Sequence, residues 1–307
     1  MGDDRRGMLY GLGAYVLWGL FPLYWPLVKP AGSLEILAHR VGWSLLALLV
    51  IVPATRSWQR LRALVRSRRR TGLLAIGAVL LAVNWGVYIY GVNTGHVVET
   101  SLGYFVNPLV TVLLGVVVLR ERLRRAQWLA LGLGMIAVVV IAIDYGRPPW
   151  IALTLAASFG SYGLIKKHVA AGAVESLSIE TSVLFLPAVA YLGVLVGQGD
   201  LTFGHHGAGQ AVLLAGAGLV TTAPLLFFGA AAPRLRLSTL GLLQYVTPIL
   251  QFGCGILVFH EPLPAAEFLG FGLVWIALIV FTVDSIRQQR SGALTRRREP
   301  EYAADVS

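Results

Sequence analysis

The sequence predicts an all-α membrane protein with ten transmembrane helices, arranged as two five-helix repeats of opposite orientation. Composition predicts the class, because 56% of the 307 residues are hydrophobic and only 13% are charged, whereas about a quarter of a soluble domain is charged. Ten long apolar stretches predict the number of helices, and a repeat between the two halves predicts their arrangement. The single cysteine, Cys254, excludes a disulfide framework and a thiol metal site.

Each predicted span is a stretch of about 20 largely apolar residues, the length that an α-helix needs to cross roughly 30 Å of hydrocarbon. In chain order the spans are 8–28, 34–53, 71–91, 101–119, 126–143, 149–165, 177–197, 210–230, 238–259 and 265–283. The connections are brief and leave no room for a separate soluble domain. The opening MGDDRRG is too short and too acidic for a signal peptide, so we expect the first span to stay in the mature protein.

Positive charge predicts the orientation of these helices. With ten spans both termini lie on one side of the membrane, and nearly all of the 25 Lys and Arg residues fall on that side. The opposite side holds Lys29 and Arg147, and Arg40 lies within a span. Because positively charged loops stay in the cytoplasm, we expect cytoplasmic termini in a multi-pass protein of the cytoplasmic membrane. The net charge of +10 is then an orientation signal, and no nucleic-acid partner is expected.

An internal repeat relates the two halves of the chain. Residues 101–144 align without gaps with residues 241–284, and 15 of the 44 positions are identical. The identical pairs include Pro108 and Pro248, Gly115 and Gly255, and Glu121 and Glu261. The arginines around Glu121 are missing around Glu261, as expected if one lies inside the cell and the other outside. We therefore predict a first repeat over 1–145, an inverted second repeat over 146–290 and a disordered cytoplasmic tail over 291–307.

Inverted repeats favour secondary transport, because two halves of opposite orientation can rock around a central cavity. The sequence contains no nucleotide-binding motif of the G-x-x-x-x-G-K-[ST] type, and no cofactor or metal is expected. Pro108 and Pro248 lie in the middle of their spans and should kink them. Such a kink could be a simple bend, or it could be a hinge that exposes a carbonyl to the cavity.

Arg40, in EILAHRVGW, is the clearest ionisable residue inside a span. Such residues are costly in hydrocarbon and usually face a cavity or a partner. Arg40 could bind substrate, or it could form a structural ion pair with Glu35 or Glu99 on the same side of the membrane. The neighbouring His39 could titrate near neutral pH or simply pack in the helix.

Glu180 is the repeat counterpart of Arg40 and lies at a similar depth from the opposite side. A carboxylate in this position is a candidate proton or cation carrier, as are Glu35 and Glu99 on the other side. It could equally be a structural clamp, neutralised by Lys166 or Lys167 at the end of the sixth span.

Several aromatic and amide residues are candidates for the cavity wall. Asn84 and Trp85 lie deep in the third span, where they could contact an aromatic or amphipathic ligand, although asparagine also joins helices. The other candidates are Trp18 in the first span and Tyr104, Asn107, Gln244 and Tyr245 around the two prolines. Four further tryptophans at span ends are predicted to be interfacial anchors without a ligand role: Trp25, Trp58, Trp128 and Trp150.

A series of distinctive motifs runs in order along the chain: AYVLWGLFPLYW, EILAHRVGWS, NWGVYIYGVN, ETSLGYFVNPL, RERLRRAQWLA, SFGSYGLIKK, SIET, VTTAPLLFFGAA, RLRLSTLGLLQYVTP and VWIALIVFTVDS. With these motifs the chain resembles the RarD family of bacterial transporters. The resemblance covers residues 7–287. This family belongs to the EamA-type group of the drug/metabolite transporter superfamily, so the resemblance implies ten helices in two inverted EamA repeats and a permease of the cytoplasmic membrane. It implies no defined site residues.

Together these patterns predict a secondary transporter, not an enzyme, that moves a small organic metabolite or drug by alternating access. The relatives that the resemblance implies often work outward, which favours an exporter. The expected partners are the lipid bilayer and a small-molecule substrate, with a monomer and a homodimer both left open. Two alternatives are a non-transporting membrane scaffold or sensor and a membrane enzyme that acts on lipid. The second lacks an aspartate-rich pair or a His/Glu metal cluster in the sequence.

Overall fold

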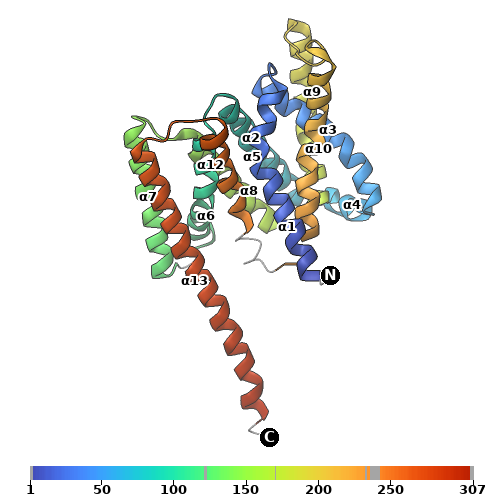
Figure 1. The fold of residues 1–307 in the computed structure, drawn as a ribbon. Coiled ribbons are helices and arrows are strands. Elements are labelled where there is room, and N and C mark those ends of the chain that lie inside the picture. Colours follow the sequence, from blue (N-terminus) through green and yellow to red (C-terminus); the bar gives the residue numbers. More distant parts are fainter. Residues whose placement is uncertain (1–2, 121–122, 170, 232–233, 236–242, 305–307) are drawn as a thin grey trace. The chain divides into compact units, whose positions relative to one another are not determined.

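The computed structural model describes residues 3–120, 123–169, 171–231, 234–235 and 243–304, and these residues form helices without a strand (Figure 1). The prediction of an all-α protein is confirmed. The helices before the middle of the chain are α1 (Asp3–Gly19), α2 (Phe21–Tyr24), η1 (Trp25–Val28), α3 (Ser33–Ala54), α4 (Trp58–Arg66), α5 (Arg68–Asn93), α6 (Val97–Leu119) and α7 (Arg125–Asp144). They are followed by α8 (Trp150–Val169), α9 (Ala173–Gln198), α10 (Gly207–Ala231), α12 (Val246–Gly253), η2 (Cys254–Val258) and α13 (Ala265–Ala304).

Seven of the described helices are long and apolar enough to span a membrane, and an eighth span results if the bent pair at the N-terminus counts as one. Helices occupy the positions of all ten predicted spans, but α8 and the short Val246–Val258 segment do not meet this length and composition test. Residues 238–242 of the ninth predicted span lie outside the described part of the chain. The ten-helix arrangement therefore stays a prediction.

The first predicted span is broken in the structure. Its two pieces, Arg5–Gly19 and Phe21–Val28, meet at an angle of 45°. Pro22 and Pro26 supply the physical reason, because proline lacks the N–H of a regular helix and its ring clashes with the preceding turn. The break places Phe21 and Trp25 in the protein core, where both are buried.

The chain forms two compact units, and each draws on both halves of the sequence. Unit 1 comprises Met1–Leu114 with Trp150–Pro262, and unit 2 comprises Gly115–Pro149 with Leu263–Ser307. In unit 1, α3 packs against α9 and α10, α5 packs against α8, and α1 packs against α10. In unit 2, α7 lies along α13 (Figure 1). The predicted repeat boundaries are not tested by this division and stay a prediction.

The helix α13 continues beyond its apolar part to Ala304, whereas the composition predicts a disordered tail after residue 290. The added turns are rich in Arg, Gln, Glu and Ala, which are good helix formers. In unit 2 the apolar part of this helix is joined to the start of α7 by an ion pair of 2.8 Å between Arg124 and Asp284.

The core of unit 1 surrounds the start of α3 and the end of α5. Its buried members include Phe21, Trp25, Ile36, Tyr88, Ile89, Leu155 and Leu214, which come from six of its helices. Two glutamates 140 residues apart, Glu35 and Glu175, lie in the first turns of α3 and α9 and are both buried. The predicted repeat itself stays a prediction.

Candidate functional site

Arg40 lies on α3 and is buried inside unit 1, with 3% of its surface exposed. Its Nε donates a hydrogen bond of 2.6 Å to the hydroxyl of Thr221 on α10. Its guanidinium carbon lies 3.8 Å from the centre of the Trp85 ring on α5. The rings of Trp25 and Phe21 lie 5.3 and 5.7 Å from the same carbon. The Arg40 cation is thus surrounded by three aromatic rings and one hydroxyl group. We call these five residues the Arg40 site.

Neither predicted acidic partner pairs with Arg40. The carboxylate of Glu35 accepts hydrogen bonds from the backbone N–H and the hydroxyl of Thr202, at 2.8 and 2.9 Å. The carboxylate of Glu99 accepts a bond of 3.0 Å from the backbone N–H of Ile151, in the first turn of α8. Both glutamates accept from backbone N–H groups instead: Glu35 from the loop before α10, and Glu99 from the N-terminus of α8, where a carboxylate is favoured. Among the described residues Arg40 has no ion-pair partner.

Trp25 corrects one sequence interpretation. It was predicted to be an interfacial anchor without a ligand role, but its ring is fully buried and lies beside Arg40. The prediction was wrong because the first span bends after Gly19. Its second piece, which carries Trp25, enters the core instead of ending at the membrane surface. Trp58, Trp128 and Trp150 are 63%, 55% and 43% exposed, as expected of anchors.

A second polar cluster joins α5, α6 and α8. The amide nitrogen of Asn84 donates to the carbonyl of Leu155 at 3.0 Å and to the hydroxyl of Ser158 at 3.1 Å. The hydroxyl of Tyr104 donates to the Asn84 amide oxygen at 3.3 Å. The structure thus brings together two predicted site residues, and Asn84 joins helices in the way that a buried amide can.

Gln251, which is not among the residues predicted from the sequence, extends the polar cluster to α12. Its amide nitrogen donates to the hydroxyl of Tyr88 at 3.2 Å and to the carbonyl of Trp18 at 3.3 Å. The ring of Tyr88 meets that of Tyr104 edge to face at 5.8 Å. The only available sequence signal was a glutamine inside an apolar segment, three residues after Pro248.

The remaining predicted cavity residues lie at separate positions. The ring of His39 is buried and stacks on Phe203, with 4.7 Å between ring centres. Asn107 is buried on α6, and its amide oxygen has no hydrogen-bond partner among the described residues. Gln244 and Tyr245 directly precede α12 and are half-buried. Pro108 lies inside α6 and Pro248 lies in the first turn of α12, so their role as kinks stays a prediction.

Glu180 is fully buried on α9 and is neutralised from α8. Lys166 forms an ion pair of 3.0 Å with its Oε1, and the hydroxyl of Tyr162 donates to its Oε2 at 3.0 Å. The same lysine contacts the hydroxyl of Ser176. This arrangement matches the structural clamp that the sequence left open, formed with Lys166. Its proposed coupling role stays a prediction.

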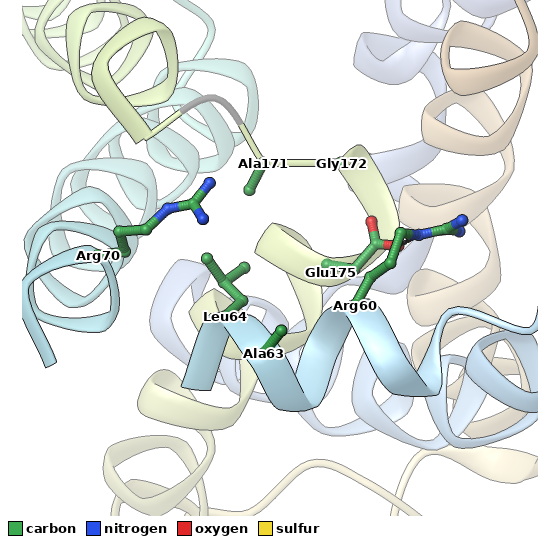
Figure 2. A pocket seen from close by; sticks show the side chains of 7 residues that line it. All are labelled: Arg60, Ala63, Leu64, Arg70, Ala171, Gly172 and Glu175. Carbon is green, nitrogen blue, oxygen red and sulfur yellow. Dashed lines mark hydrogen bonds and ion pairs between the residues drawn. The ribbon is translucent and has the colours of Figure 1, made fainter. Parts of the chain in front are cut away.

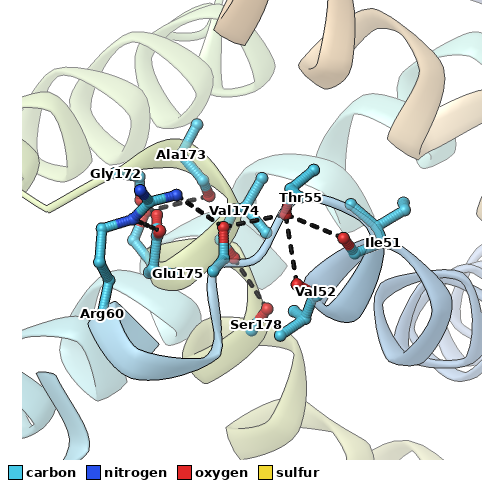
Figure 3. Close-up of polar contacts among 11 residues, drawn as sticks. Ile51, Val52, Thr55, Arg60, Gly172, Ala173, Val174, Glu175 and Ser178 are labelled. Carbon is cyan, nitrogen blue, oxygen red and sulfur yellow. Dashed lines mark hydrogen bonds and ion pairs between the residues drawn. The ribbon is translucent and has the colours of Figure 1, made fainter. Parts of the chain in front are cut away.

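A pocket of about 260 Å³ lies elsewhere in unit 1, beside α4 and the starts of α5 and α9 (Figure 2). Its lining residues are Arg60, Ala63, Leu64, Arg70, Ala171, Gly172 and Glu175. Arg60 forms an ion pair of 2.5 Å with Glu175, and its terminal nitrogen donates to Ser57 at 2.9 Å. The hydroxyl of Thr55 links this network to the carbonyl of Ile51 at the end of α3 (Figure 3).

This pocket is a weaker candidate for the functional site than the Arg40 site. Of the two arginines that line it, Arg60 has a carboxylate partner and a side chain that is 68% exposed, and Arg70 donates to the carbonyl of Val169. The charge of Arg60 is thus already balanced by Glu175, and this arginine needs no further ligand. Arg40, by contrast, is a buried cation without a carboxylate among its described neighbours. Buried charge inside a membrane protein marks a ligand or ion pathway more often than a surface pair does.

Comparisons with known proteins identify the family. A family model described as the EamA-like transporter family matches residues 5–143. The chain is 57% identical over 288 residues to Protein RarD of Streptomyces exfoliatus, covering 94% of this chain and 91% of that protein. It is 42% identical to Protein RarD of Escherichia coli strain K12, covering 94% and 97% of the two chains. An uncharacterized transporter of Vibrio cholerae is 39% identical over 93% and 94%.

A solved crystal structure supports the fold. It is 17% identical to this chain, covers 92% of it and 98% of its own length, and superposes with a TM-score of 0.59. The apolar helices and the names of the relatives define a multi-pass membrane transporter and point away from an enzyme. The chain belongs to the RarD family of EamA-type transporters, as the motifs predicted.

Proposed function

We propose that the protein is a secondary transporter that exports a small organic metabolite or drug across the cytoplasmic membrane by alternating access. The single observation that carries the proposal is the buried guanidinium of Arg40 between helices α3, α5 and α10, which has no ion-pair partner in the described part of the chain. A charge in this position is costly unless it serves a ligand or an ion path. In this proposal both termini lie in the cytoplasm, and the bilayer and the substrate are the protein's partners.

The repeat supports the mechanistic part of the proposal. Arg40 lies on α3 and its repeat counterpart Glu180 lies on α9. In the proposed topology the two residues lie at similar depths from opposite faces of the membrane. Two inverted halves of this kind can open a central site to each side in turn. Opening toward one side of the membrane would break one set of contacts between helices, and opening toward the other side would break a different set. The ion pair between Lys166 and Glu180 would belong to one of these sets.

The test compares metabolites in cells and medium by mass spectrometry. One strain overproduces the wild type, a second Arg40→Ala and a third Arg40→Met, which fills the side-chain volume without the charge. The matched control is Arg62→Ala, which removes an exposed arginine on α4. We expect a compound that accumulates outside with the wild type and with Arg62→Ala, and that stays inside with both Arg40 variants at equal protein levels in the membrane.

Other outcomes would contradict specific parts of the proposal. Accumulation inside cells that contain the wild type would reverse the direction of transport. Normal transport by both Arg40 variants would remove Arg40 from the site. Identical metabolite pools in all strains, over a range of growth media, would favour a non-transporting scaffold or sensor.

A further inference from the structure

We propose that the Arg40 site binds the oxyanion of a small organic acid, a carboxylate or phosphate group attached to an apolar body. The inference rests on the proposed transport function and adds the chemical class of the substrate. It follows from the hydrogen-bond donors, the aromatic rings and the missing counter-charge around Arg40.

Arg40 has more donors than its surroundings use. A guanidinium carries five N–H groups and no acceptor. Only Nε has a hydrogen-bond partner among the described residues, the hydroxyl of Thr221 at 2.6 Å. That hydroxyl in turn donates to the carbonyl of Ala217 at 2.8 Å. The four N–H groups on the two terminal nitrogens therefore have no hydrogen-bond acceptor in the described part of the chain.

The indole of Trp25 adds another donor without a partner. It is fully buried, its ring centre lies 5.3 Å from the guanidinium carbon of Arg40, and its N–H meets no acceptor in the described part of the chain. Buried donors normally have partners, so the unpartnered Trp25 N–H beside the Arg40 guanidinium points to a missing acceptor. A single group that is rich in acceptor oxygens would accept hydrogen bonds from both Arg40 and Trp25.

The aromatic rings leave the hydrogen-bonding edge of the guanidinium available. A guanidinium stacks on an aromatic ring through its flat face. At 3.8 Å from the ring centre, Trp85 occupies one face of the Arg40 guanidinium. The N–H groups lie in the plane of the fork, and a carboxylate or phosphate accepts two of them in parallel. The rings of Trp25 and Phe21 provide apolar surface close to that position.

The repeat supplies a comparison within the same molecule. At the equivalent position Glu180 is also buried, but Lys166 neutralises it and Tyr162 donates to its second oxygen. A charge with only a structural role is expected to be paired in this way, because an unpaired buried ion is strongly unfavourable. Arg40 differs from Glu180 in having no such partner among the residues that the structure describes. An anionic substrate would supply that partner, whereas a cationic substrate would be repelled.

The experiment measures binding by the purified full-length protein in detergent, so that it does not depend on transport. The probes share a phenyl ring and differ in charge: benzoate, phenyl phosphate, neutral benzamide and cationic benzylamine. We expect benzoate or phenyl phosphate, or both, to raise the unfolding temperature in a saturable manner, and benzamide and benzylamine to leave it unchanged. The oxyanion that binds distinguishes a carboxylate substrate from a phosphate substrate.

Variants assign the preference to Arg40. Arg40→Lys keeps the charge but loses the fork, and we expect it to weaken oxyanion binding about 10- to 100-fold, as for the loss of a charged hydrogen bond. Arg40→Met should abolish the difference between benzoate and benzamide, whereas Arg62→Met should bind as the wild type does. A folded Arg40→Met protein is expected, because replacing a buried ion by an apolar side chain of similar volume is well tolerated.

The inference is overturned if neither oxyanion stabilises the wild type, if benzamide does so equally, or if Arg40→Met keeps the preference. Its failure can be told apart from failure of the proposed function. Oxyanion binding without any change in cellular metabolite pools would refute transport and leave the site intact. Export of a neutral compound without oxyanion binding would refute the site chemistry and leave transport intact.

Discussion

Substitution of Gly218 by alanine tests the contact between α3 and α10, the two helices that carry Arg40 and Thr221. At Gly218 a Cβ atom would lie 2.4 Å from the carbonyl carbon of Trp43, 2.5 Å from its Cβ and 2.6 Å from the backbone nitrogen of Ser44. Ordinary contacts between such atoms are 3.4–4 Å. The atoms in the way belong mainly to the α3 backbone, so no side-chain rotation can relieve the clash.

The two helices must therefore move apart by about 1 Å, and such overpacking costs about 1–3 kcal/mol. Each kcal/mol lowers the unfolding temperature by roughly 2–4 °C for a domain of this size range. Because Thr221 follows Gly218 by three residues on the same helix face, the separation should also lengthen its bond to Arg40. We expect Gly218→Ala to unfold several degrees lower and to transport less than the wild type.

The assay is thermal unfolding of the purified protein in detergent, followed by circular dichroism. The matched control is Gly42→Ala on α3, where a Cβ atom would meet nothing within 4 Å. This control should be neutral or stabilised by up to about 1 kcal/mol, because alanine favours the helix more than glycine does. If Gly218→Ala unfolds at the temperature of the control, the close approach of α3 and α10 is wrong.

Two further predictions concern carboxylates that bind other parts of the protein. Glu261 accepts bonds of 2.6 and 2.7 Å from the backbone N–H groups of Val97 and Val98. We expect Glu261→Gln to lose about 1–3 kcal/mol of unfolding free energy; an unchanged denaturation midpoint in detergent would contradict this capping role. Lys166→Met leaves Glu180 unpaired and should cost about 3–5 kcal/mol, while the double variant with Glu180→Gln should recover most of that loss. Strictly additive effects of the two substitutions in thermal unfolding would refute the pairing.

The helices were predictable from the sequence because their signal is local. A stretch of about 20 apolar residues indicates a span wherever it occurs, and the structure places a helix at each predicted position. The exceptions have local causes that the length rule ignores. Pro22 and Pro26 break the first span, and the hydroxyl, glycine and lysine residues of α8 make it less apolar than its neighbours.

The candidate site was predictable residue by residue, but its partners were not. Arg40, Trp85, Asn84 and Tyr104 were selected as unusual residues inside apolar spans, and the structure places each of them in contact with other helices. The glutamates expected near Arg40 bind backbone N–H groups instead. Such groups become available only at helix ends and loops, whose positions depend on the fold.

By itself the sequence determined that this chain is an all-α membrane transporter of the RarD family, because apolar length, charge bias and ordered motifs are properties of the chain. Only the tertiary structure decided which polar groups meet: the Arg40 guanidinium on the Trp85 ring, and the carboxylate of Glu261 at the start of α6. The physical reason is that these helices are apolar nearly all round. Their sequence therefore does not specify which face turns toward which neighbour, and that rotation is set by packing, for instance where Gly218 admits the α3 backbone.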